Sequence, residues 1–296
     1  MGYKYLHEIV SLAEKNNKPF WKLIIEDDCT ERNVSERESF ETMRGMLRAM
    51  QEADAHYDPT LHSASGLVGG DGAKLEQFRL EGKSLFGDLI SQIMEKAVKM
   101  SESNACMKRI VAAPTAGSCG VLPAVLLSYE EQKQLPEDEL VKALFVAAGI
   151  GSVLAESASI SGAEGGCQAE IGSASAMAAG AVVYLEGGDN EQIVHAAALA
   201  LKNMLGLTCD PVAGLVEVPC VKRNVSGAVN AIVCAQMSLA HIKSAIPPDE
   251  VIDSMRRIGK QIPACLRETG GEGLAITPTA QQIVKELSRH PDGVIS

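Results

Sequence analysis

Apolar residues recur along this chain at three- and four-residue spacing, which is the period of an amphipathic α-helix. Residues 35–57 begin with the capping-box pair Ser35 and Glu38. Apolar residues then follow on one helical face, at Phe40, Met43, Leu47 and Met50. The pattern therefore predicts a helix that starts at Ser35.

Three later stretches carry helix start and stop signals: residues 136–160, 191–206 and 247–263. The first and third begin with proline followed by acidic residues, and the second ends at Gly206, which we expect to be its C-cap. Only two short runs are strand-like, at 109–114 and 214–221. These patterns predict a mainly α protein.

Neither a repeat nor a clear linker divides the chain. We therefore expect one compact helical domain over residues 1–296, with residues 1–60 as an N-terminal helical arm. Aromatic residues make up only 4% of the chain, so the core must consist of Ala, Val, Leu, Ile and Met.

The net charge is −11, and 46% of the residues are hydrophobic against 22% charged. This composition is typical of a soluble globular protein, and the acidic balance argues against nucleic acid or an anionic membrane as a partner. The N-terminus lacks the features of a signal peptide. Glycines and charges interrupt each apolar run before the roughly 20 residues that cross a membrane. We therefore expect a cytoplasmic protein.

Two glycine-rich or small-residue turns are candidates for binding an anion. Residues 65–74, SGLVGGDGAK, lack the Walker A pattern, and Ser65 and Gly66 belong either to a structural helix-entry loop or to a loop for a small anion such as a carboxylate. In residues 112–125, the residues Thr115, Gly117 and Ser118 precede an apolar stretch. They either bind a carboxylate or merely cap a helix through Ser118.

The eight cysteines are at positions 29, 106, 119, 167, 209, 220, 234 and 265. In a cytoplasmic protein such cysteines are reduced and serve packing, catalysis or metal binding. Cys167, Cys209 and Cys220 stand among glycine, proline and aspartate, without zinc-knuckle or ferredoxin spacing. Metal binding and simple core packing both remain open for these three on spacing alone.

A helix N-terminus beside Cys167 leads us to expect a lowered pKa for its thiol. The other five cysteines are expected to be packing residues, with Cys119 as a small buried filler. His195, within an apolar helix, is expected to be structural, and His62 borders the glycine-rich loop.

Four stretches together closely resemble the α chain of the bacterial iron–sulfur L-serine dehydratases. They are residues 112–125, 159–180, 201–224 and 266–279. The likeness runs from the loop at 65–74 almost to the end of the chain. It implies a largely helical catalytic domain whose glycine-rich loops carry a [4Fe–4S] cluster, with Cys167, Cys209 and Cys220 as the cluster ligands.

The resemblance further implies a lyase that converts L-serine to pyruvate and ammonia, with the open iron acting as a Lewis acid on the substrate hydroxyl. It also implies a separate β chain, an oligomer and sensitivity to oxygen. For the substrate pocket we predict Ser65, Gly66, Thr115, Gly117, Ser118 and Lys222. Lys222 and Arg223 either balance charge there or lie on a solvated face. The general base is left unassigned and is expected from either chain.

Two positions depart from the family pattern. Val68 stands where a threonine is common, and the chain ends in DGVIS without the cysteine that fills the open iron in some fused relatives. Three other functions remain open. The first is a pyridoxal-phosphate lyase, with Lys74 as its Schiff-base lysine. The others are a desulfidase that acts on L-cysteine with the same cluster and a non-catalytic subunit that senses iron or redox state.

Overall fold

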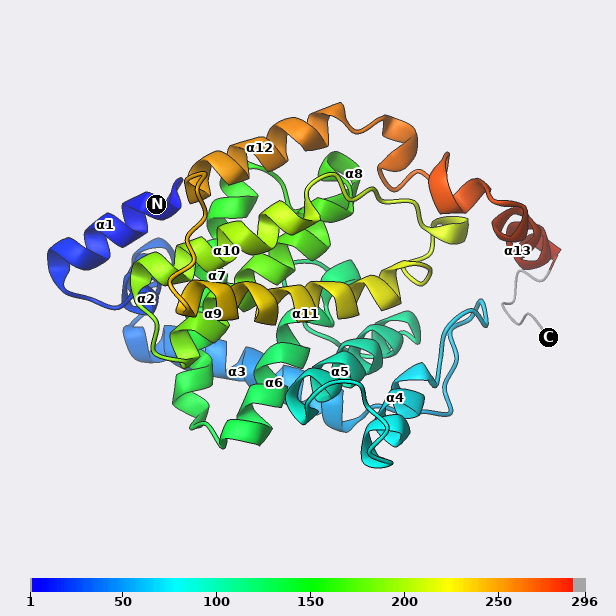
Figure 1. The fold of residues 1–296 in the computed structure, drawn as a ribbon, viewed down its shortest axis with the longest axis horizontal. Coiled ribbons are helices and arrows are strands. Elements are labelled where there is room, and N and C mark those ends of the chain that lie inside the picture. Colours follow the sequence, from blue (N-terminus) through cyan, green and yellow to red (C-terminus); the bar gives the residue numbers. More distant parts are fainter. Residues whose placement is uncertain (1, 290–296) are drawn as a thin grey trace.

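A computed structural model of the chain describes residues 2–289 (Figure 1). Within this range the chain forms thirteen α-helices, four short 3-10 turns and one π-turn, but no β-strand. The mainly α prediction is therefore confirmed. The final DGVIS, on which the expectation about the open iron rests, lies outside the described residues.

The first half of the chain contains α1 Leu6–Asn16, α2 Phe20–Arg32, α3 Glu36–Ala55, α4 Asp71–Leu80, α5 Asp88–Ala105, η1 Ala116–Ser118, α6 Val121–Lys133 and α7 Glu137–Ser157. The second half contains α8 Gly162–Gly165, η2 Gln168–Gly172, α9 Ser173–Leu185, α10 Asn190–Met204, η3 Val212–Gly214, α11 Cys220–Leu239, α12 Pro248–Gln261, η4 Ala264–Leu266, η5 Gly273–Ile276 and α13 Pro278–Arg289.

Helix α9 lies at the centre of the bundle and packs against α6, α7, α10 and α11 (Figure 1). It is built almost wholly from Ala, Ser, Gly and Val, and residues 173–183 are all buried. Because the distance between packed helices depends on the side chains between them, such small residues let four neighbours approach one helix closely. This explains how a chain with few aromatics fills its interior.

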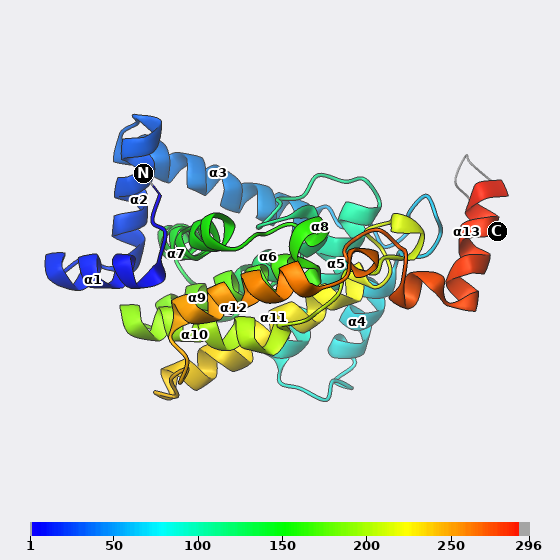
Figure 2. The same cartoon turned by 90° about the horizontal axis from the view of Figure 1, so that it is seen from above.

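The N-terminal helices share this core. Leu6 of α1, Phe20 of α2 and Leu47 of α3 belong to the same buried cluster as the central helices. Helix α2 and α3 both pack against α7, while α1 and α13 lie at opposite ends of the molecule (Figure 2). The predicted capping box is confirmed, since Ser35 and Glu38 exchange both hydrogen bonds at the start of α3.

The prediction of strands at residues 109–114 and 214–221 was wrong. Residues 109–114 are an irregular connection, and residues 214–221 form a turn that leads into α11. Pro219 removes a backbone donor that a sheet would need, and helix α11 begins directly after it. Gly206 was also misplaced as a cap, because α10 ends at Met204 and Gly206 follows in a left-handed conformation.

One described helix, α7, is long and apolar enough by composition to cross a membrane. The expectation that no such run exists was therefore wrong for this helix. Two-thirds of its apolar window is buried within the bundle, where α7 packs against α9, α2 and α3. A central core helix has the same composition, since it meets apolar neighbours on most sides.

We predict opposite effects of alanine at two helical glycines. In α3, a Cβ at Gly45 meets nothing within 4 Å, so Gly45→Ala should raise the free energy of unfolding by about 0.5–1 kcal/mol through helix propensity. In α7, a Cβ at Gly149 would lie 2.6 Å from Ile24 and 2.9 Å from Phe20. Gly149→Ala should therefore lower stability by about 1–3 kcal/mol. Urea titration checks both, and equal effects would contradict the packing of α2 on α7.

Candidate functional site

Three separate segments bring Cys167, Cys209 and Cys220 together. Cys167 immediately precedes η2, Cys209 lies in the loop after α10, and Cys220 is the first residue of α11. Each is at most 9% exposed, and all eight cysteines of the chain are free. A charge on Cys167 or on Cys220 would raise the pKa of Cys209, so the three thiols share one neighbourhood. This neighbourhood is around η2, which packs against both α8 and α11; these helices are labelled in Figure 1.

Burial dominates the acidity of these thiols. It raises the pKa of Cys167 to about 11 and that of Cys220 to about 12, and it raises the pKa of Cys209 further still. The charge of Arg223 opposes the shift at Cys167 without reversing it. The expected lowering of this pKa by a helix N-terminus was therefore wrong, because desolvation of the thiolate outweighs the helix.

Glycine allows the Cys167 loop to pack on the segment that carries Cys209. Gly166 has φ +73°, and a Cβ there would lie 2.8 Å from the carbonyl oxygen of Leu207. The next backbone bond fixes the same contact, since the N–H of Gln168 donates to that carbonyl at 3.1 Å. A Cβ at Gly162 would lie only 3.3 Å from the Sγ of Cys209. No larger residue fits either position without moving a cysteine-bearing segment.

Arg223 connects α11 to the other two segments. Its guanidinium donates to the carboxylate of Asp210 at 2.8 Å and to the carbonyl of Thr208 at 2.7 Å. Its positive charge also lowers the pKa of the Cys167 thiol, so the two groups lie near each other. Because the Arg223 side chain is only 18% exposed and its guanidinium pairs with Asp210, it balances charge inside the site, and the solvated-face alternative is wrong for this residue.

Glu170, which the sequence did not single out, is a carboxylate whose charge acts on all three cysteines. Thr115 donates to its Oε1 at 2.7 Å. A Cβ at Gly162 would lie 2.8 Å from its Oε2. Burial raises the pKa of this carboxyl. Its position three residues after Cys167 was the available signal, because such a pair shares one helical face.

The predicted turn at Thr115, Gly117 and Ser118 lies against the same carboxylate. Thr115 and Ser118 cap η1 reciprocally, and a Cβ at Gly117 would lie 3.0 Å from Oε1 of Glu170. Thr115 and Ser118 therefore cap the short η1 and not the apolar helix that follows. This capping does not decide whether the turn also binds a carboxylate. The structure thus gathers the predicted cysteines and this turn around Glu170.

Asn224, which sequence analysis also missed, ties this turn to α11. Its Nδ2 donates to the carbonyls of Gly117 at 2.8 Å and Cys220 at 3.0 Å, and its Oδ1 accepts from the N–H of Gly120 at 2.9 Å. Asn224 is almost fully buried and lies one helical turn after Cys220. That four-residue spacing from Cys220, which places the two residues on one helical face, was the signal in the sequence.

Ser65 and Gly66 lie in the loop between α3 and α4, as expected. The hydroxyls of Ser63 and Ser65 both donate to Oε2 of Glu217, which is buried three residues before Cys220. Within residues 2–289, no hydrogen bond joins Ser65 or Gly66 directly to the turn at 115–118. The loop therefore reaches the cysteine segment through Glu217.

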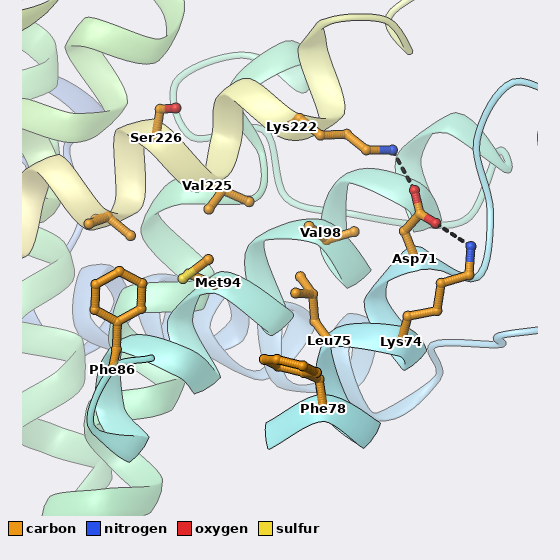
Figure 3. A pocket seen from close by; sticks show the side chains of 11 residues that line it. Asp71, Lys74, Leu75, Phe78, Phe86, Met94, Val98, Lys222, Val225 and Ser226 are labelled. Carbon is orange, nitrogen blue, oxygen red and sulfur yellow. Dashed lines mark hydrogen bonds and ion pairs between the residues drawn. The ribbon is translucent and has the colours of Figure 1, made fainter. Parts of the chain in front are cut away.

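Lys222 lies apart from the buried thiols. Its ammonium pairs with Asp71 at 2.6 Å, and Lys74 pairs with the same carboxylate at 2.7 Å (Figure 3). This partner raises the pKa of Lys74. A Schiff-base lysine must be deprotonated to react, so this exposed ion pair disfavours the pyridoxal-phosphate alternative.

The remaining cysteines and histidines have structural surroundings. Cys119 and Cys234 are fully buried, while Cys29, Cys106 and Cys265 are half-buried. The Nδ1 of His195 accepts from the N–H of Ser244 at 3.2 Å, as expected for a structural histidine. His62 lies with its Nδ1 3.3 Å from the carbonyl of Thr60 at the edge of the glycine-rich loop.

The sequence model of the family "Serine dehydratase alpha chain" matches residues 15–275. The chain belongs to this family. It is 46% identical to the "Probable L-serine dehydratase, alpha chain" of Bacillus subtilis over 96% of this chain and 95% of that one. It is 38% identical to the "L-serine dehydratase, alpha chain" of Peptoniphilus asaccharolyticus, over 96% and 98% of the two chains.

Longer relatives also contain this sequence. "L-serine dehydratase 1" of Escherichia coli is 45% identical over 182 residues, which are 61% of this chain but only 40% of that one. The serine dehydratase α-chain sequence thus occurs both as a chain of this size and within a larger polypeptide.

The thiols of this serine dehydratase family member differ in arrangement from the ligands of a single metal ion. Among residues 2–289, no three His, Cys, Asp or Glu side chains are close enough together to hold one metal ion. A four-iron cluster makes a different demand, because each cysteine binds a different iron and the sulfurs surround a larger body. Three buried, unpaired thiols with one buried arginine beside them fit that demand.

We predict that Asn224→Ala loosens the turn at 115–120. The change removes two donated bonds and one accepted bond, leaving buried backbone groups unsatisfied. The free energy of unfolding should fall by about 2–4 kcal/mol. Guanidinium titration measures this, with exposed Gln236→Ala on the same helix as the control. Equal stabilities of the two variants would contradict the role assigned to Asn224.

Proposed function

We propose that this chain is the catalytic α chain of an L-serine dehydratase that produces pyruvate and ammonia. One observation carries the proposal: in a member of the serine dehydratase family, three cysteines from distant segments converge in one buried place. We assign Cys167, Cys209 and Cys220 as ligands of a [4Fe–4S] cluster. With three protein ligands, the cluster when bound supplies Lewis-acid chemistry at the β-hydroxyl of serine.

The residues around this place hold the substrate in the proposed mechanism. Thr115, Gly117 and Ser118 offer hydroxyl and N–H groups to the substrate carboxylate. Glu170 keeps the Thr115 hydroxyl in place through its 2.7 Å hydrogen bond. Such positioning lowers the entropy that must be lost on the way to the transition state.

Ser65, Gly66 and Lys222 complete the proposed pocket. The Ser65 hydroxyl is engaged with Glu217 and the Lys222 ammonium with Asp71. Each must therefore exchange that partner for the substrate carboxylate, and both bonds hold the side chain in place beforehand. Arg223 keeps the neighbourhood of the cysteines electrically balanced, since it is the buried cation that contacts a cysteine thiol.

The overall reaction removes the α-proton and hydroxide from serine, and the resulting aminoacrylate tautomerises and takes up water to give pyruvate and ammonia. The base that removes the α-proton needs hydrogen-bond reach to it. We place this base outside the residues assigned so far, either in this chain or in a separate β chain. We further propose that the α and β chains assemble into an oxygen-sensitive oligomer in the cytoplasm.

The first test is the iron and acid-labile sulfide content of anaerobically purified chain. The wild type should hold about four of each, and the Cys167→Ala/Cys209→Ala/Cys220→Ala variant should hold neither. The matched control is Cys234→Ala, a buried cysteine outside the site. Pyruvate release from L-serine by the chain together with its β chain should follow the iron content.

Other results of this test select among the alternatives. Iron that survives the triple substitution would refute the ligand assignment. A cluster that supports sulfide release from L-cysteine but no pyruvate from L-serine would indicate a desulfidase. A cluster without either activity in the α–β pair would indicate a sensing subunit.

A second prediction concerns the hydroxyl of Thr115. Thr115→Val preserves the shape of the side chain but removes its bond to Glu170. We expect it to reduce kcat/KM for L-serine by roughly 10–100-fold, the effect of losing one or two positioned hydrogen bonds. Thr115→Ser, which keeps the hydroxyl, should stay within about threefold of the wild type. Iron content, measured in parallel, must be equal in both variants, and equal activities would refute the role.

A further inference from the structure

An apolar groove of about 800 Å³ lies between α4, α5 and α11 (Figure 3). Its walls are mainly large apolar side chains, among them Leu75, Phe78, Phe86, Met94, Val98 and Val225. Polar groups are concentrated at one end, where Lys222 and Lys74 both pair with Asp71 (Figure 3). The groove contains none of the cysteines, and none of the turn at 115–118 lines it.

The apolar surface continues beyond the groove. Phe78 and Phe86, which line it, are 45% and 53% exposed, and in the connection between α4 and α5 Leu85 is 89% exposed. A small ligand seated in the groove would leave Leu85 in water. Clustered apolar exposure of this kind marks an interface with another macromolecule.

The charge of the groove indicates the kind of partner. Two ammonium groups share one carboxylate at its polar end, which leaves one positive charge there, whereas the whole chain has a net charge of −11. A second copy of the chain would carry the same net charge of −11, so the two copies would repel each other overall. A different chain with an acidic side chain beside an apolar stretch complements both features.

The groove also adjoins both segments that carry the proposed site. Asp71 belongs to the glycine-rich stretch 65–74 and is the first residue of α4, and Lys222 is two residues after Cys220. We infer that this groove is where the β chain of the dehydratase docks, through an apolar segment that carries an acidic residue. The inference rests on the proposed function, and it adds the surface through which the two chains meet.

The test is the Kd between this chain and the β chain encoded in the same genome, measured by calorimetry. Leu85→Asp/Phe86→Asp should weaken binding at least about tenfold, because a charge cannot enter an apolar contact without loss of hydration. Ile242→Asp/Ile246→Asp is the control, since these residues are similarly exposed, at 51% and 50%, in another connection. Lys74→Glu should weaken binding as well, by reversing the charge at the polar end.

An unchanged Kd in the Leu85/Phe86 variant overturns the inference, and so does a β chain that does not bind the wild type. Light scattering supplies a further check on the oligomeric state. If the wild type is a dimer, the Leu85/Phe86 substitutions make it a monomer and β-chain binding is intact, the groove binds a second copy of this chain instead. Thermal unfolding and circular dichroism of Leu85→Asp alone exclude a folding defect, because that side chain is almost fully in solvent.

Iron content and pyruvate release are measured on the same samples, which separates the two proposals. If the chain has neither cluster nor turnover but the Leu85/Phe86 substitutions still weaken β-chain binding, the proposed function is refuted and the docking surface is supported. If the chain holds its full cluster but the Leu85/Phe86 substitutions leave β-chain binding unchanged, the proposed function stands and the docking surface is refuted.

Discussion

The buried guanidinium of Arg223 is the interaction on which the arrangement of the site depends. From the first turn of α11 it reaches Asp210, the backbone of Thr208 and the thiol of Cys167. It therefore joins all three cysteine-bearing segments, since Cys220 is on its own helix. A cation with little access to water is stabilised by being paired and hydrogen-bonded, so the bonds to Asp210 and Thr208 hold this guanidinium in place against the Cys209 segment.

Small residues in the surrounding helices allow the cysteine-bearing segments to come together in that geometry. Helix α9 has mainly small side chains, so α7, α10 and α11 lie close to it, and α10 and α11 also pack against each other. At the edge of this packing, Gly166 brings the Cys167 loop onto the backbone at Leu207. The same use of small residues thus builds both the core and the site.

Helix periodicity predicted most of the fold, because helix signals are local. The capping box at Ser35 and the start of α7 after Pro136 were both found in this way. The strand-like run at 214–221 failed, because a strand depends on a partner that local pattern does not reveal. The sequence of residues 214–221 alone does not show that a helix begins at Cys220.

The sequence predicted those parts of the site that consist of unusual residues in unusual contexts. It did not predict the parts that consist of common residue types. Three cysteines in glycine- and proline-rich contexts stood out, whereas Glu170 and Asn224 are common residue types whose roles come from distant contacts. The pKa of Cys167 was predicted in the wrong direction for a related reason. A helix terminus is visible in sequence, but the burial that outweighs it depends on the whole fold.

Helices α4 and α11 connect the site to the apolar groove, and this connection has a mechanical consequence. The start of α11 carries Cys220, Arg223 and Asn224 toward the site, while Lys222, on the same turn, faces Asp71 at the groove. A helical turn moves as a unit, because its backbone hydrogen bonds fix the residues relative to one another. A contact that displaces the backbone of this turn would therefore also displace the side chains that hold the turn at 115–120 and the Cys209 segment. Only such a backbone displacement, and not a rotation of the Lys222 side chain alone, would link binding at the groove to order in the site.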